Sequence, residues 1–145
     1  MKKMTEKTLE FETYHYPILI KEFHLDTFGH VNNATYLELF EEARWDLITK
    51  NGYGLPRIME SGIGPTILEI KLKFSKEIKL REEISIETQV VSYDNKIAKL
   101  MQRMLRIKEV CCTAEFVIAL FDLKSRKIIL PTEDWLKAVG VKTQI

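Results

Sequence analysis

Long apolar runs are scarce in this sequence, and neither sign of charge dominates it. The longest unbroken apolar run covers residues 116–121, far short of the roughly 20 residues that a membrane-spanning helix needs. Residues 1–10 are polar and charged and contain no apolar core of the signal-peptide kind. The 22 basic residues are matched by 21 acidic ones, so the net charge is +1. This balance argues against a protein that neutralises nucleic acid or an anionic membrane surface. We therefore expect no nucleic-acid partner and no membrane insertion.

Cysteine is also rare, since the chain has only Cys111 and Cys112. Neighbouring side chains on a strand point to opposite faces, so these two thiols are poorly placed to form a disulfide with each other. A zinc site with four thiolate ligands is excluded because it needs more cysteines than the chain has. We interpret the pair as two half-buried thiols in a reducing compartment, and we expect a cytoplasmic protein.

The length and composition are those of an ordinary soluble domain. The chain has 145 residues, of which 46% are hydrophobic, and a chain of this size buries about two-thirds of its unfolded surface without a disulfide or metal. We find no internal repeat, low-complexity tract or linker. We therefore expect a single domain over residues 1–145.

The first half of the chain predicts a strand, a loop and a long helix. Residues 9–23 are rich in aromatic and β-branched residues, which favours a strand with a break at Pro17. Residues 24–33 have no period. A helical pattern then begins near Asn33, with Asn32 or Asn33 as its N-cap, and ends at the Asn51-Gly52 stop signal. One side of this helix is apolar and carries Tyr36, Phe40, Ala43 and Leu47.

The second half predicts four antiparallel strands and a short terminal helix. Alternating or continuous apolar patterns cover residues 68–74, 84–90, 97–107 and 111–123, and a short helix is predicted over residues 133–139. A long helix must bury its apolar stripe, and a sheet curled around it is the simplest solution. The predicted class is therefore α+β. The open sheet edges predict a homo-oligomer.

The chemistry is concentrated in residues 26–33. Asp26, His30 and a capped helix start fall within these eight residues. A helix N-terminus presents free N–H groups and a positive dipole end, which can stabilise the oxyanion formed when a carbonyl is attacked. Asp26 would activate water as a general base or attack directly, so the combination suits acyl transfer to water. The alternatives are that Asp26 only makes a turn and that His30 is a hydrogen-bonded structural residue.

Four motifs in this region resemble a known family. They are His24-Leu25-Asp26, His30-Val31-Asn32-Asn33-Ala34, Tyr36-Leu37-Glu38 and Glu41-Glu42-Ala43-Arg44-Trp45-Asp46. Together they resemble the signature of hotdog-fold acyl-CoA thioesterases of the 4-hydroxybenzoyl-CoA thioesterase family, and within it the bacterial long-chain acyl-CoA thioesterases. The resemblance implies an antiparallel sheet of about five strands wrapped around one long central helix.

The resemblance also implies roles for individual residues. Asp26 matches the catalytic aspartate, and Asn33 matches the residue whose backbone N–H points at the thioester carbonyl. His30 is a third catalytic candidate, although Phe28 stands where related plant enzymes have an asparagine between the aspartate and the histidine. The substrate-binding candidates on the helix are Tyr36, Phe40 and Glu41.

Two further features of the implied site remain open. An ion pair with Arg44 is the structural alternative for Glu41, because the two residues are three apart on one helix. The family often has an Arg-Pro step near the CoA phosphates, where this chain has Ser75-Lys76-Glu77. The candidate CoA contacts are therefore Lys71, Lys73 and Lys76, and a solvated strand face is their alternative interpretation.

The implied function is hydrolysis of fatty acyl-CoA thioesters to free fatty acid and CoA. We expect a preference for medium-to-long acyl chains, which would lie in an apolar tunnel formed by the helix and by Tyr53, Leu55, Ile58 and Met59. The site would be shared between subunits of a homodimer or homotetramer. No metal or redox cofactor is implied, and CoA enters only as part of the substrate. The alternatives are an acyl-ACP thioesterase and a non-catalytic acyl-binding hotdog protein.

Overall fold

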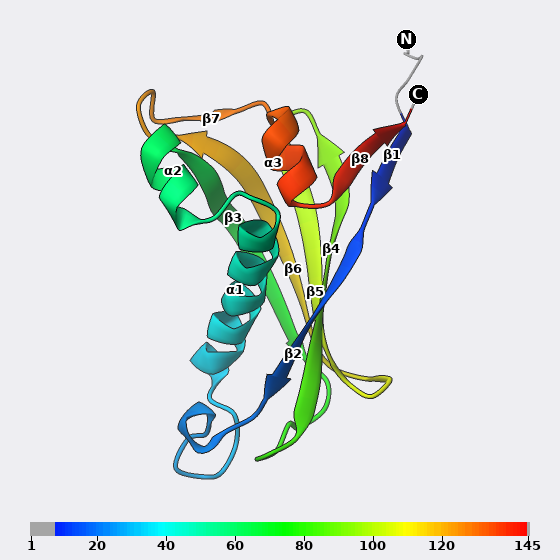
Figure 1. Cartoon of the computed structure of the whole chain (residues 1–145). Helices are drawn as coiled ribbons and strands as arrows, with labels where there is room; N and C mark the ends of the chain where they lie inside the picture. Colours follow the sequence, from blue (N-terminus) through cyan, green and yellow to red (C-terminus); the bar gives the residue numbers. More distant parts are fainter. Residues whose placement is uncertain (1–7, 145) are drawn as a thin grey trace.

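A computed structural model describes residues 8–144 and shows one large antiparallel sheet packed against a long helix (Figure 1). The main sheet has the strand order β2-β4-β5-β6-β3, and β7 pairs with β6 beyond this path. A separate two-stranded sheet joins β1 to β8 near the chain ends. This arrangement confirms the predicted α+β class. The elements in chain order are β1 Thr8–Phe11, β2 Thr13–Leu19, a 3-10 helix Glu22–His24, α1 Asn33–Lys50, α2 Leu55–Ser61, β3 Ile63–Phe74, β4 Glu83–Asp94, β5 Ile97–Arg106, β6 Glu109–Asp122, β7 Lys127–Ile129, α3 Glu133–Ala138 and β8 Val141–Gln144.

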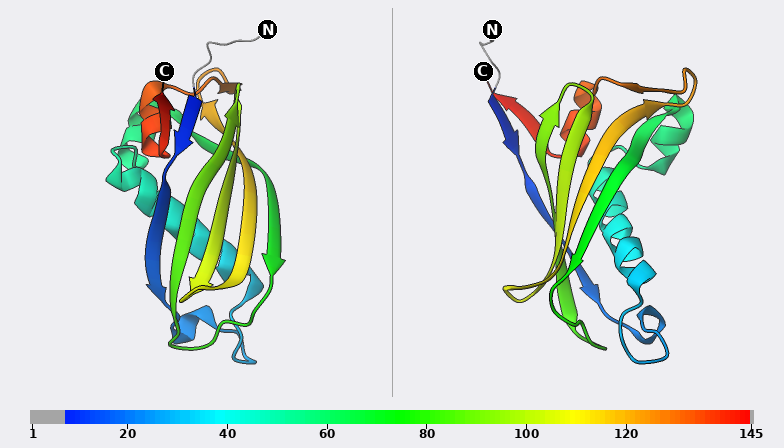
Figure 2. Two further views of the ribbon diagram at one scale, coloured as in Figure 1. Left: turned by 90° about the vertical axis from the view of Figure 1, so that its right-hand side faces the viewer. Right: turned by 180° about the vertical axis from the view of Figure 1, so that it is seen from behind.

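Helix α1 forms where the capping signals predict it. The Asn32 side chain accepts a hydrogen bond from the Ala34 N–H at 2.9 Å, which occupies one of the free donors of the first turn. The helix ends at Asn51, and Gly52 follows with a φ of 84°, a conformation that glycine adopts without steric cost. Figure 2 shows α1 running across one face of the sheet. Its buried residues are Thr35, Tyr36, Leu39, Phe40, Ala43, Leu47 and Ile48.

The period-two pattern of the strands places one apolar set under α1. On β4, for example, Ile84, Ile86, Thr88 and Val90 are buried, whereas Glu83 is exposed and the alternate residues Ser85, Glu87 and Gln89 are only half-buried. The antiparallel register aligns this set with buried residues on β5 and β6. The helix and the inner face of the sheet therefore share one hydrophobic core.

The first predicted strand differs from the observed one. It divides at Glu12, whose N–H donates to the Gly140 carbonyl at 2.8 Å, and it ends at Leu19 rather than at residue 23. Pro17 causes no break and pairs with Ser85 inside β2. Because β2 is an edge strand, the missing N–H of Pro17 can face away from the sheet.

The structure also contains elements that the sequence patterns did not predict. Helix α2, which has a proline in its first turn, lies in the Gly- and Pro-rich stretch after α1, and the short strands β7 and β8 were not expected. The predicted terminal helix is confirmed as α3. Cys111 and Cys112 are both free and fully buried, more deeply than the half-buried thiols expected. Within residues 8–144, no helix is both long enough and apolar enough to cross a membrane.

Strand β3 is the other edge of the main sheet, and α1 leaves part of its inner face uncovered. The register pairs Ile70 with buried Phe116, so the two side chains share a face of the sheet. Nevertheless Ile70 is 44% exposed. We define the β3 strip as the apolar side chains on this partly uncovered face: Ile67, Ile70, Leu72 and Phe74.

Candidate functional site

The start of α1 borders an open surface depression of about 340 Å³, here named the helix-start cavity. It brings together three of the predicted site residues, His30, Asn33 and Tyr36. The loop between β3 and β4 supplies the opposite wall. The remaining lining residues are Val31, Phe74, Ser75, Lys76 and Glu77.

The first turn of α1 leaves a backbone donor at this cavity. The Ala34 N–H is bound by the Asn32 side chain, and the Thr35 N–H donates to the Asn32 carbonyl at 2.9 Å. Among residues 8–144, no acceptor binds the Asn33 N–H. The first turn carries no acidic side chain either, so no carboxylate on the helix itself neutralises the positive end of its dipole. This end of the helix is therefore suited to stabilise an oxyanion.

Asp26 closes its own loop through one carboxylate oxygen. Its Oδ1 accepts hydrogen bonds from the Phe28 N–H at 2.9 Å and from the His30 N–H at 3.1 Å. These bonds, the one from His30 first, hold the pKa of the Asp26 carboxyl below its usual range, so the group is charged at neutral pH. Asp26 therefore stabilises a turn, which was the alternative interpretation of this residue from the sequence. Its second oxygen, Oδ2, accepts no hydrogen bond from residues 8–144 and is free to meet water. Asp26 does not itself line the helix-start cavity.

His30 is tied to a residue that the sequence did not suggest. Its Nε2 lies 2.8 Å from an Oε2 of Glu77, across the helix-start cavity, and both side chains are about half exposed. The neighbouring His24 behaves differently, because it is buried and its Nδ1 accepts the Lys21 N–H at 2.9 Å. Burial, followed by the charge of Lys21, lowers the pKa of His24, so it is a neutral structural residue. His30 is thus the exposed histidine at the candidate site.

Two aromatic candidates on α1 have different surroundings. Tyr36 lines the helix-start cavity and packs edge-on against Phe74, with ring centroids 4.9 Å apart. Burial raises the pKa of the Tyr36 hydroxyl above its usual value. Phe40 is fully buried and packs against Phe116 in the core. Contact of either ring with substrate remains a prediction.

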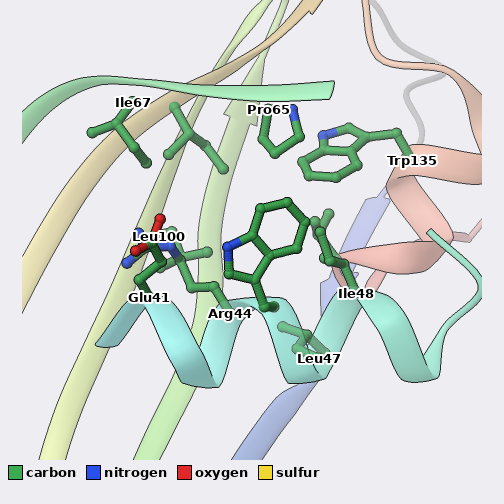
Figure 3. Close-up of a pocket in the computed structure, with 11 residues that line it drawn as sticks. Glu41, Arg44, Leu47, Ile48, Pro65, Ile67, Leu100 and Trp135 are labelled. Carbon is green, nitrogen blue, oxygen red and sulfur yellow. The ribbon is translucent and has the colours of Figure 1, made fainter. Parts of the chain in front are cut away.

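A second cavity, of about 120 Å³, lies farther along α1 and is here named the far cavity (Figure 3). Only Glu41 and Leu47 of its lining were expected from the sequence to contact substrate. Arg44, Trp45 and Ile48 also lie on α1, and the other walls come from β3, β5, β6 and the C-terminal segment. Figure 3 shows the charged ends of Glu41 and Arg44 at one end of this cavity and Trp135 at the other. The full lining is Glu41, Arg44, Trp45, Leu47, Ile48, Pro65, Ile67, Leu100, Ile118, Trp135 and Val139.

The expected ion pair between Glu41 and Arg44 is not formed. Within the described part of the chain, the Arg44 guanidinium instead donates to the Gln102 Oε1 at 2.9 Å. It also lies over the Phe116 ring, 4.4 Å from the centroid. Glu41 is exposed and, among residues 8–144, forms no hydrogen bond or ion pair through its side chain, so its carboxylate is free to face the cavity.

Of the other residues predicted to contact substrate, some line a cavity and others do not. Leu55 and Met59 are 51% and 74% exposed and line neither of these cavities, so the expectation that they form a tunnel is wrong. Lys76 lines the helix-start cavity. Lys71 and Lys73 lie on the other face of β3, as their register with Glu115 and Thr113 requires.

Comparison with known proteins identifies the family. The family model described as the thioesterase-like superfamily matches residues 22–139. This range includes the Asp26 loop and the α1 residues that line the two cavities. The chain belongs to this superfamily. Its fold is the thioesterase hotdog fold, as the sequence motifs predicted.

Individual thioesterases are similar to the chain in sequence and structure. The long-chain acyl-CoA thioesterase FadM of Escherichia coli is 30% identical over 114 residues, covering 77% of this chain and 86% of FadM. The crystal structure of the probable thioesterase YbaW from Escherichia coli superposes with a TM-score of 0.73 at 25% identity, covering 86% of this chain and 94% of that one. The chloroplastic acyl-acyl carrier protein thioesterase ATL3 of Arabidopsis thaliana is 22% identical over 128 residues, covering 83% of this chain and 65% of ATL3.

Proposed function

We propose that this thioesterase hydrolyses fatty acyl-CoA thioesters to free fatty acid and CoA, with medium-to-long acyl chains preferred. The observation that carries the proposal is the free Asn33 N–H at the start of α1, in a cavity beside the Asp26 loop. Thioester hydrolysis needs an oxyanion donor and a base or nucleophile, and these two groups supply them. The similarity to a long-chain acyl-CoA thioesterase supports CoA as the carrier.

In the proposed mechanism, the thioester carbonyl oxygen accepts the Asn33 N–H. The positive end of α1 stabilises the negative charge that develops when the carbonyl carbon is attacked. Asp26 Oδ2 takes a proton from water while the water oxygen bonds to that carbon. The C–S bond then breaks, and the CoA thiolate leaves and is protonated. In the nucleophilic variant, Oδ2 itself attacks to form an anhydride, which water then hydrolyses. Neither route requires a metal or redox cofactor.

The acyl chain is proposed to run along the β3 strip from the helix-start cavity to the far cavity. Asn33 and Ile48 are fifteen positions apart on α1, which corresponds to about 22 Å at 1.5 Å per residue. A zigzag chain with bonds of about 1.5 Å advances about 1.25 Å per methylene, so this path accommodates roughly 16 to 18 carbons. Each buried methylene contributes about 0.8 kcal/mol, so affinity would rise with chain length until the path ends.

We also propose that the active form is a cytoplasmic homodimer, in which the β3 edges of two subunits meet. The β3 strip leaves Ile70 and Phe74 44% and 49% exposed on an unpaired sheet edge, which is a ready surface for a second copy. A partner at this edge would also roof the acyl path, so that the site would be shared. The two free buried cysteines are consistent with a reducing compartment.

The test is thiol release from acyl-CoA substrates with 4 to 18 acyl carbons, run beside matched acyl-ACP thioesters. We expect kcat/KM to rise with chain length through at least roughly 8 to 12 carbons, because each methylene adds buried apolar surface. A flat profile would refute the length preference, and faster turnover of every acyl-ACP would favour the acyl-carrier-protein function that the ATL3 similarity suggests. Tight acyl-CoA binding without turnover would indicate a non-catalytic acyl-binding protein.

A further inference from the structure

A charged pair stands in the otherwise apolar acyl path proposed above. Glu41 and Arg44 are the charged residues that line the far cavity, and the other lining residues are apolar or aromatic. Figure 3 shows their charged ends at the side of the cavity that faces the start of α1. An unsubstituted acyl chain offers neither group a hydrogen bond. A charge beside an apolar ligand loses water without compensation, so this pair needs another explanation.

Arg44 is only partly explained by its contacts with the protein. The guanidinium is half-buried and has five N–H donors. Within residues 8–144, its one hydrogen-bond acceptor is Gln102 Oε1, at 2.9 Å. Both N–H donors of the Gln102 amide are used as well, since its Nε2 donates to the Phe40 carbonyl at 3.0 Å and to Thr88 Oγ1 at 2.9 Å. This network therefore holds the guanidinium in one place while leaving donors unused.

Glu41 supplies the complementary half of a hydrogen-bonding site. Its carboxylate is an acceptor only, and the Arg44 guanidinium is a donor only. A hydroxyl group both donates and accepts, so one hydroxyl placed between the two side chains would satisfy both. A ligand carboxylate would pair with Arg44 but would be repelled by Glu41. A carbonyl oxygen would leave Glu41 without a donor.

From this arrangement we propose that Glu41 and Arg44 form a subsite for a hydroxyl group on the middle of the acyl chain. The proposal rests on the proposed acyl-CoA function. The Gln102 amide contacts both the Arg44 guanidinium and the Phe40 carbonyl, and Phe40 and Glu41 lie seven and eight positions beyond Asn33. These positions correspond to about 10 to 12 Å along α1. At about 1.25 Å per methylene, the hydroxyl would sit at about the ninth or tenth carbon from the thioester.

The test compares positional isomers in binding and in turnover. Thioether analogues of hexadecanoyl-CoA, which cannot be hydrolysed, carry a hydroxyl at carbon 3, 10 or 16, and their Kd values are measured by calorimetry. The same isomers as thioesters are assayed by thiol release. We expect the 10-hydroxy analogue to bind about tenfold more tightly than the 16-hydroxy isomer, a factor that one hydrogen bond to a charged group supplies. Equal affinities for all three isomers would overturn the proposal.

Substitutions assign the effect to the charged pair. Arg44→Met should abolish the preference for the 10-hydroxy isomer. The matched control is Arg103→Met, because Arg103 pairs with Glu87 outside both cavities, and this variant should keep the full preference. If Arg44→Met does not fold, Glu41→Met leaves the Gln102 network intact and should reduce the preference about threefold. A preference that survives both site substitutions would contradict the assignment.

The two failures are distinguishable. If the 10-hydroxy preference appears in binding but no thioester is cleaved, the subsite stands and the hydrolytic function fails. If every thioester is cleaved and position has no effect, hydrolysis stands and the subsite is rejected.

Discussion

Filling the far cavity should shorten the acyl chain that the enzyme accepts, and Val139→Phe is the substitution of choice. Val139 follows α3, is buried, and lines this cavity beside Trp135. The cavity volume of about 120 Å³ is similar to that of a cavity that accepts benzene, so an added aromatic ring can occupy it. The substitution lies well away from the start of α1, so it changes the end of the acyl path rather than the reacting centre.

The expected magnitude follows from the same volume. At about 30 Å³ for a group of the size of water, 120 Å³ holds about four methylenes. Four methylenes at about 0.8 kcal/mol each contribute about 3 kcal/mol, which corresponds to roughly a hundredfold in binding. An octanoyl chain extends only about 9 Å, whereas Glu41, the first residue of the cavity, lies about 12 Å along α1 from Asn33. Hydrolysis of octanoyl-CoA should therefore change little.

The assay is kcat/KM for hexadecanoyl-CoA and octanoyl-CoA in the wild type, in Val139→Phe and in the graded variant Val139→Ile. We expect the C16/C8 ratio to fall about a hundredfold in Val139→Phe and by a smaller factor in Val139→Ile. Cooperative thermal unfolding of each variant verifies that the fold is intact. An unchanged C16/C8 ratio in folded Val139→Phe would refute the far cavity as the end of the acyl path.

Three further outcomes test the site, the core and the assembly. Asp26→Asn should lower kcat/KM about 100-fold or more, because the amide keeps the oxygen that closes the loop but cannot act as a base. Because the pKa of Asp26 is lowered, wild-type kcat/KM should fall only below about pH 3.8, where the carboxylate is protonated. A loss of wild-type activity already at pH 5 to 6 would indicate that another group is the base. Gln102→Leu should destabilise the fold by about 2 kcal/mol in urea unfolding, because it strips hydrogen-bond partners from Arg44 and Thr88 in the core, and a change below about 0.5 kcal/mol would contradict that account. Ile70→Glu should convert a dimer to a 17.0 kDa monomer in sedimentation by placing a charge on the β3 strip, whereas a wild-type protein that already sediments as a monomer would exclude the shared site.

Local signals account for the parts of the fold that sequence analysis predicted well. The Asn32 cap and the Asn51-Gly52 stop define α1 because both act within one turn of the helix. The alternation along β4 predicts its buried face for the same reason, since it depends only on neighbouring residues. Helix α2 was missed because it is short: Leu55, Ile58 and Met59 have helical spacing, but they cover only one turn, and none of the helix's residues is buried.

In the candidate site, too, local features were predicted from the sequence and contacts between distant segments were not. The placement of Asn33 at the helix start followed from the cap and the family motif, and the structure places it with His30 and Tyr36 at one cavity. The partnership of His30 with Glu77 could not be predicted, because it joins two loops 47 positions apart whose approach depends on how β3 and β4 pack against α1. The sequence suggested, as an alternative, that Asp26 makes a turn. It could not predict which of the two carboxylate oxygens closes the turn and which remains free.

By itself, the sequence determined the long capped helix, the alternating strands and the family signature around Asp26, because capping, periodicity and motif spacing are properties of neighbouring residues. Only the tertiary structure decided where the far cavity lies and which charges line it. The far cavity joins Ile48 on α1 to Val139 after α3, and the Arg44 guanidinium is held by Gln102 on β5. Such contacts depend on how the helix crosses the curved sheet, which is set by the packing of the whole core and by no local stretch of the chain.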